Sequence, residues 1–124
     1  AAMQVVGGTA DFPERFWIVS VHLHWPWPYG QSDHVRFLLP ILDKLQGPAI
    51  MAGDFNMVRW ANSVTQMAEV LGVRAAGPML GSCIGLSRVL PLPIDHIFAT
   101  GGGKVTLRPA AGSDHLGLLA QVVI

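Results

Sequence analysis

The segment over residues 48–56 ends with two polar side chains placed two residues apart. Residues 49–52 are apolar and predict a short buried strand, which runs directly into the sequence Gly-Asp-Phe-Asn. In an extended chain, residues i and i+2 point to the same side, so Asp54 and Asn56 are expected to leave the strand together. Polar side chains at the carboxyl end of a buried strand are often functional. For Asp54 taken alone, a turn or a helix cap is the alternative.

The other candidate residues also stand at the ends of expected strands, namely His22, Asp95, His96, Asp114 and His115. Apolar neighbours would bury Asp95, and burial of a carboxylate is costly unless it meets a hydrogen-bond donor. Adjacent residues of an extended chain point to opposite sides, so of Asp114 and His115 one can bind a metal while the other meets Asp95. This pattern predicts an imidazole oriented by one carboxylate beside a cation bound by others.

Strands and helices are expected to alternate through the first two thirds of the chain. The strands are expected over residues 1–6, 16–23, 49–52, 94–99, 104–108 and 117–124. One helix should start at Ser32 or Asp33, kink at Pro40 and stop at Gly47. A second should start at Asn62 or Ser63 and stop at Gly72. This alternation predicts α/β layering.

The remaining segments are expected to be turns and loops. Residues 7–13 predict a turn, and the glycines at 101–103 predict a hairpin between the two strands that flank them. Residues 76–93 predict a long loop rich in glycine and proline, and such a loop in a compact domain is usually functional or mobile.

The composition is unusually apolar for a chain of 124 residues. Hydrophobic residues make up 51% of the chain and charged residues 13%, whereas a soluble domain typically has about 25% charged residues. The formal net charge is zero, so no polybasic patch for nucleic acid or a membrane surface is expected. No apolar run approaches the ~18 residues needed to span a bilayer. The apolar excess therefore predicts a partner other than lipid.

Several residues also allow a purely structural interpretation. A satisfied core or strand-end histidine is the simpler interpretation of His22 and of His96, and Cys83 is expected to be an inert packed thiol. His22 and His24 on one strand face are a possible zinc pair, for which His34 is the only further soft ligand nearby. The tryptophans at 25 and 27 are more often a packed loop than a wall of a substrate site.

The motifs taken together resemble the endonuclease/exonuclease/phosphatase superfamily, which includes deoxyribonuclease I, exonuclease III and neutral sphingomyelinase. The resemblance runs from about residue 16 to the end and rests on Ser20-Val21-His22-Leu23, Gly53-Asp54-Phe55-Asn56, Ile94-Asp95-His96-Ile97 and Gly112-Ser113-Asp114-His115. It implies a phosphodiester hydrolase that depends on Mg²⁺ or Mn²⁺. Gly-Asp-Phe-Asn or Ser-Asp-His alone would be a weak signal. Their order and their places at strand ends make the joint signal strong.

The resemblance also implies a role for each matched residue. On the metal side, Asp54 would orient and help activate the attacking water, Asn56 would bind the phosphate and the metal-side oxygens, and Asp114 would face the cation. Carboxylate and amide oxygens suit a hard cation.

On the other side of the scissile phosphate, the resemblance implies that His22 contacts the phosphate and that Asp95 pairs with His115. His115 would then act as a general base or as a stabiliser of the charged transition state. Phosphoryl transfer depends mainly on such positioning and charge stabilisation.

One departure from the family pattern concerns the first half of the domain. Family members carry there an asparagine on an early strand and a glutamate that is the principal metal ligand, whereas Glu14 and Glu69 are the only glutamates here and neither has such a context. Residues 1–124 are therefore expected to be the C-terminal half of the domain. The expected fold is half of a four-layer α/β/β/α sandwich, with one mainly antiparallel or mixed sheet and two helices on one face.

A half-domain would expose an apolar sheet face. The expected partners are the missing N-terminal half or a second copy of the chain in a homodimer, and the isolated fragment is expected to be inactive. The alternative is a non-catalytic binding or oligomerisation module on the same scaffold. Nucleic acid and a phospholipid head group both remain possible substrates, and the full-length protein is either cytoplasmic or membrane-anchored, of bacterial type.

Overall fold

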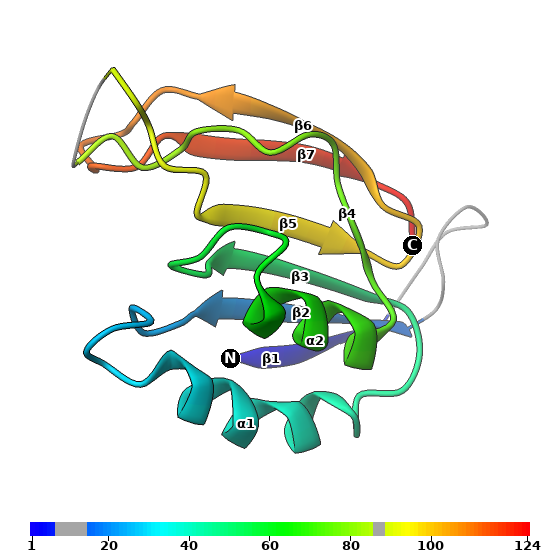
Figure 1. Cartoon of the computed structure of the whole chain (residues 1–124). Coiled ribbons are helices and arrows are strands. Elements are labelled where there is room, and N and C mark those ends of the chain that lie inside the picture. The colour runs from blue at the N-terminus through cyan, green and yellow to red at the C-terminus, as the bar shows by residue number, and fades with distance from the viewer. Residues whose placement is uncertain (7–14, 86–88) are drawn as a thin grey trace.

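The computed structural model describes residues 1–6, 15–85 and 89–124, which form two sheets and two helices (Figure 1). The expected turn over residues 7–13 lies outside the described residues. The elements are β1 (Ala2–Val6), β2 (Arg15–His22), α1 (Gln31–Leu42), β3 (Ala49–Asp54), α2 (Asn62–Leu71), β4 (Arg74–Ala75), β5 (Asp95–Ala99), β6 (Gly103–Arg108) and β7 (Gly117–Val122). The α/β class is confirmed, and the short strand β4 is an addition to the expected elements.

The larger sheet has five strands in the order β1-β2-β3-β5-β4. Strands β2 and β3 are parallel, and the other pairs are antiparallel, which confirms a mixed sheet. Gly53 lies in β3 opposite Val21, with a φ of 145°. A Cβ atom at Gly53 would collide with the carbonyl oxygen of Val21. Only glycine therefore lets β3 run alongside β2 as far as Asp54.

Both helices cover one face of this sheet, as expected (Figure 1). Alternate strand residues point to this face, and the apolar positions of each helix recur at helical spacing. The core that they form includes Val19, Val21, Met51 and Phe98 from the strands, Val35 and Leu42 from α1, and Val64, Met67 and Leu71 from α2. Burial of these side chains is the main stabilising contribution to the fold.

The expected hairpin across residues 101–103 is wrong. Strand β5 pairs with β3 and β4, while β6 pairs with β7 in a separate two-stranded sheet. A strand has two hydrogen-bonding edges, and both edges of β5 are already used. The chain therefore turns away through Gly102 and Gly103, whose φ angles are 74° and 158°. A Cβ atom at Gly103 would collide with the carbonyl oxygen of Gln121 on β7.

The first helix also differs from its expected bounds. Its N-cap is Gly30, in the left-handed region with a φ of 66°, and not Ser32 or Asp33. The Asp33 carboxylate instead accepts a hydrogen bond of 3.0 Å from Arg36 within the first turn. The helix contains Pro40 and ends at Leu42, before the expected stop at Gly47.

The second helix has its expected bounds. It begins at Asn62 and ends before Gly72, which has a φ of 68° as expected of a glycine that ends a helix. Its apolar positions face the core.

The sheet face opposite the helices carries apolar side chains as well. Met3 on β1 lies opposite Ile18 on β2, which in turn lies beside Ile50 on β3. The Met3 residue is 60% exposed, and Ile18 and Ile50 are partly exposed. Among the described residues no helix is long and apolar enough to cross a membrane.

The core packing predicts a large loss of stability for Phe98→Ala. Phe98 is 3% exposed, and truncation of such a side chain leaves a cavity that costs about 3 to 5 kcal/mol of unfolding free energy. Phe37→Ala is the matched control, because Phe37 is 69% exposed and its loss should change stability by no more than about 0.5 kcal/mol. Urea denaturation measures both, and an equal loss for the two variants would contradict this core.

Candidate active site

Three strand ends meet at one edge of the five-stranded sheet. Because β2 and β3 are parallel, both end there, and the antiparallel β5 begins there (left side of Figure 1). The register places His22 beside Asp54 and Asp54 beside Asp95. Side chains that are 32 and 41 residues apart in the sequence thus become neighbours across adjacent strands.

Asp95 and His115 form the shortest of the described ion pairs. His115 Nδ1 lies 2.7 Å from Asp95 Oδ2, and the side chains are 24% and 17% exposed. Because a carboxylate only accepts, Nδ1 carries the proton that it donates, and Nε2 is the ring atom left for another partner. Ser82 Oγ donates a second hydrogen bond, of 2.6 Å, to the same Asp95 oxygen. The expectation that a histidine supplies the donor for Asp95 is confirmed.

The described residues of the expected loop, 76–85 and 89–93, hold this pair in place. The backbone of Cys83 bridges both Leu92 and His115, and the N–H of Leu116 donates a hydrogen bond of 2.7 Å to Ser82 O. The N–H of Ile84 likewise donates one of 2.8 Å to the carbonyl oxygen of Asp114. The loop therefore links the start of β5 to the segment before β7.

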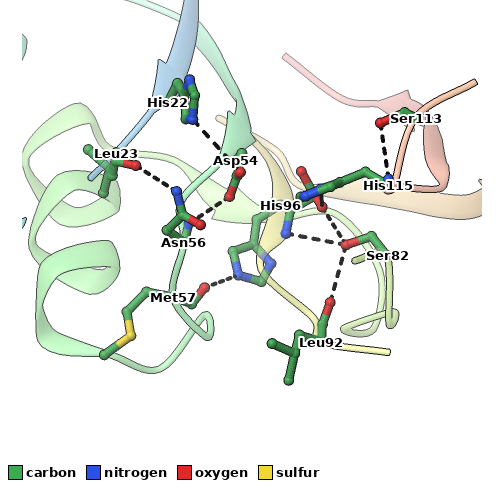
Figure 2. Close-up of polar contacts among 11 residues, drawn as sticks. His22, Leu23, Asp54, Asn56, Met57, Ser82, Leu92, His96, Ser113 and His115 are labelled. Carbon is green, nitrogen blue, oxygen red and sulfur yellow. Dashed lines mark hydrogen bonds and ion pairs between the residues drawn. The ribbon is translucent and has the colours of Figure 1, made fainter. Parts of the chain in front are cut away.

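Asp54 and Asn56 lie side by side at the end of β3, but through a turn and not through the expected extended chain (Figure 2). The backbone N–H of Asn56 donates a hydrogen bond of 2.7 Å to Asp54 Oδ1, and the Asn56 side chain donates one of 2.7 Å to Leu23 O. Asn56 has a φ of 48°, in the left-handed region that asparagine tolerates. His22 Nε2 lies 4.0 Å from Asp54 Oδ2, and the His22 side chain is 81% exposed.

The electrostatics of the site shift two pKa values upwards. Burial raises the pKa of the Asp54 carboxyl above its ordinary value, and the charge on Asp95 adds to this, although the Asn56 hydrogen bond opposes it. For His115, burial lowers the pKa, but the hydrogen bond and charge of Asp95 outweigh burial, so the pKa is raised. The imidazolium form of His115 is thus favoured in the metal-free site.

His96 is a core residue, as the structural interpretation proposes. It is 4% exposed, and its Nε2 donates a hydrogen bond of 2.8 Å to Met57 O (Figure 2). Burial lowers the pKa of His96, which favours the neutral ring.

An open cavity of 610 Å³ lies over these strand ends. Its lining residues are His22, Leu23, His24, Trp25, Tyr29, Asp54, Asn56, Cys83, Gly85, Asp114 and His115. Gly85 makes room for Asp114, because a Cβ atom at Gly85 would lie 2.8 Å from Asp114 Oδ2. Cys83 is buried at 4% exposure against the cavity wall. The cavity therefore brings together Asp54, Asn56, Asp114, His22 and His115.

The donor atoms fit a divalent cation. Ligand atoms of Asp54, Asp95 and His115 all lie within 4.8 Å of one another, the one such group of three among the residues with described positions. Within this group His115 and Asp95 already pair with each other, and Asp114 lines the same cavity without belonging to the group. One or two carboxylates together with substrate phosphate oxygens are a usual set for Mg²⁺.

The described residues contain no comparable group of three ligands for the zinc site that His22 and His24 suggested. The ring centroids of His24 and His34 lie 4.5 Å apart. The ring nitrogens of His22, His24 and His34 do not all lie within 4.8 Å of one another. Glu69 is exposed on α2, and Glu14 lies outside the described residues.

Sequence reasoning missed two polar residues that support the site. One is Ser82, described above, and the other is Gln31. Gln31 is 3% exposed, and its Nε2 donates hydrogen bonds of 2.7 Å to His24 O and 2.9 Å to Phe55 O. Its Oε1 accepts one of 2.8 Å from Ser63. Gln31 thus connects the segments that follow β2 and β3. No sequence pattern distinguishes it, because its partners are backbone atoms distant in the chain.

A family model described as the Endonuclease/Exonuclease/phosphatase family matches residues 3–115. The chain belongs to this family. Its members are phosphoesterase-type hydrolases, and the expected resemblance is confirmed with a match that begins earlier in the chain than residue 16. A search of curated proteins finds no match.

Solved structures share the fold of this endonuclease/exonuclease/phosphatase chain. A conserved protein of unknown function from Enterococcus faecalis V583 is 18% identical with a TM-score of 0.73, over 98% of this chain and 55% of that one. An endonuclease/exonuclease/phosphatase from Beutenbergia cavernae is 20% identical with a TM-score of 0.58, over 97% and 43%. The human Nocturnin catalytic domain is 18% identical with a TM-score of 0.51, over 86% and 45%. The chain thus spans about half the length of these structures.

The site geometry predicts that Asp95→Asn lowers the pKa of His115. Loss of the carboxylate charge removes the contribution that outweighs burial, so the imidazolium should lose its proton at a lower pH than in the parent chain. NMR titration of the metal-free chain measures this pKa directly. His34 is the internal control, because burial lowers its pKa and Asp95 makes no contribution there. An unchanged His115 pKa would show that the two side chains do not pair in solution.

Proposed function

We propose that the intact protein is a divalent-metal-dependent phosphodiester hydrolase whose reaction takes place in the cavity over β2, β3 and β5. The observation that carries this proposal is the Asp95–His115 pair, whose ligand atoms lie within 4.8 Å of that of Asp54. A hydrogen-bonded imidazole next to a partly buried carboxylate is what hydrolysis of a phosphodiester needs for charge stabilisation and for activation of water.

On one side of the cavity, Asp54 and Asp114 would hold Mg²⁺ or Mn²⁺. When bound, the cation would neutralise phosphate oxygens and lower the pKa of bound water. Asp54 would also orient the attacking water through the oxygen that Asn56 does not engage. One amide hydrogen of Asn56 is used by Leu23 O, so its second hydrogen would donate to a phosphate oxygen and its amide oxygen would face the cation.

On the other side, His115 would face the phosphate with Nε2, because Asp95 engages Nδ1. The raised pKa of His115 favours the imidazolium, whose charge would stabilise the negative charge of the transition state, while its neutral form would serve as the general base. His22 is exposed enough to contact a non-bridging phosphate oxygen. Water adds to phosphorus and gives up a proton, one P–O ester bond breaks, and the leaving alkoxide takes up a proton, so that the net transfer from water yields a phosphomonoester and an alcohol.

The partners of the chain belong to the proposal too. The apolar sheet face opposite the helices would be covered by the remainder of the domain or by a second copy of this chain. A further carboxylate from that partner would complete the cation's ligands, since no glutamate lies near the cavity in the described parts of the chain. The 124 residues on their own are therefore expected to have little or no activity.

The test is hydrolysis of bis-p-nitrophenyl phosphate with Mg²⁺ or Mn²⁺, by this chain and by any longer form that its gene encodes. Turnover should disappear with a chelator and fall by about 100-fold or more in Asp54→Asn and in His115→Ala. Asp43→Asn is the matched control, because Asp43 is an exposed carboxylate at the end of α1, outside the cavity.

The outcomes separate the two functions expected from the sequence. Turnover only in the longer form would support a hydrolase that needs the rest of its domain. Turnover that survives the chelator, or equal turnover by an active form and its Asp54→Asn variant, would refute the metal-dependent reaction. No turnover in either form would favour a non-catalytic binding or oligomerisation module.

A further inference from the structure

Three aromatic side chains stand exposed beside the cavity. Trp25, Trp27 and Tyr29, here called the aromatic rim, lie in the segment that joins β2 to α1 and are 40%, 85% and 65% exposed. Trp25 and Tyr29 also line the cavity. The expectation that the two tryptophans form a packed loop is wrong for Trp27, because it is almost fully exposed. Large aromatic side chains grouped on a surface mark interaction sites.

The backbone around the aromatic rim is held by hydrogen bonds. Asn56 binds the carbonyl oxygen of Leu23, Gln31 binds that of His24, and His24 Nδ1 lies 3.3 Å from Tyr29 O. Two prolines, at 26 and 28, further restrict the segment. The rim is thus presented outwards by a fixed support next to the proposed catalytic residues.

The charge around the rim argues against a polyanion. Residues 23–31 contain no Lys, Arg, Asp or Glu. Among the described residues that line the cavity, two are aspartates and none is Lys or Arg. A nucleic-acid backbone is held mainly by Lys and Arg contacts to phosphate, so this edge of the described chain has little to offer it.

The chemistry of the rim matches a neutral lipid–water interface. Trp and Tyr combine an apolar ring with a polar N–H or O–H group and are enriched at the head-group level of membranes. Aromatic faces also attract quaternary ammonium groups such as choline. Phosphatidylcholine carries that group on a phosphodiester, and its head group has no net charge.

We propose that the aromatic rim inserts into the interfacial region of a phosphatidylcholine-type bilayer and so brings a lipid head-group phosphodiester to the cavity. This inference rests on the proposed function and names its substrate class. Trp25 and Tyr29 line the cavity over the ends of β2 and β3. The bilayer would therefore approach the sheet from the edge at which β2 and β3 end.

The test is binding of the metal-free chain to phosphatidylcholine vesicles, measured by sedimentation and by tryptophan quenching with brominated lipid. The parent chain should bind, and its fluorescence should be quenched. The double variant W27A/Y29A should bind about ten-fold more weakly or worse, because it loses the apolar area that enters the interface. Phe37→Ala is the matched control, since Phe37 is an equally exposed aromatic residue on α1, outside the rim.

Binding does not require hydrolysis, so the two proposals fail separately. Equal vesicle binding by the parent and W27A/Y29A, or no binding by the parent, would overturn the proposed role of the aromatic rim. Hydrolysis of a soluble diester would in that case still support the proposed function. Rim-dependent vesicle binding with no turnover of the soluble diester, by this chain or by the longer form, would support the rim and count against the hydrolase. Rim-dependent binding of a single-stranded oligonucleotide in place of vesicles would overturn the lipid assignment, because stacked bases would then be the ligand.

Discussion

The position of β3 between a parallel and an antiparallel neighbour is the constraint on which the site depends. Parallel pairing with β2 brings the two carboxyl ends to one edge, and antiparallel pairing with β5 adds an amino end there. A shift of one residue in either register would send a polar side chain to the opposite face of the sheet. Gly53 secures the register on the β2 side, because any side chain at this position would collide with β2.

A second requirement follows from the burial of Asp95. A carboxylate that is largely removed from water needs donors, and here it receives them from Ser82 and His115. Both donors come from segments outside the five-stranded sheet, so the loop that carries Ser82 has a structural task despite its irregular backbone. The same arrangement that satisfies the carboxylate also orients the imidazole and favours its charged form.

The two faces and the edge of the sheet differ in what covers them. Helices α1 and α2 bury one face (Figure 1). The opposite face keeps apolar side chains such as Met3 in contact with solvent. The edge that carries the site is bordered by exposed aromatic residues, held by Asn56 and Gln31. The high apolar content of the chain is thus shared among the core, the open sheet face and this edge.

The sequence alone determined the element types, the mixed α/β class and the candidate residues, because these depend on local periodicity and on short motifs at strand ends. The bounds of α2 followed in the same way from its apolar spacing and from Gly72. The sequence also led to the pairing of Asp95 with a histidine, since an apolar strand around a carboxylate calls for a donor. These are properties of residues that are close together in the chain.

Only the tertiary structure decided which distant residues meet. At residues 101–103 the chain passes from the five-stranded sheet to the two-stranded sheet, because both edges of β5 are already paired. No local pattern reveals this pairing. The start of α1 at Gly30, the support from Ser82 and Gln31 and the outward presentation of Trp27 depend likewise on contacts between distant segments. A sequence pattern records what each segment prefers by itself, whereas hydrogen-bond partners and exposure are settled when the segments pack together.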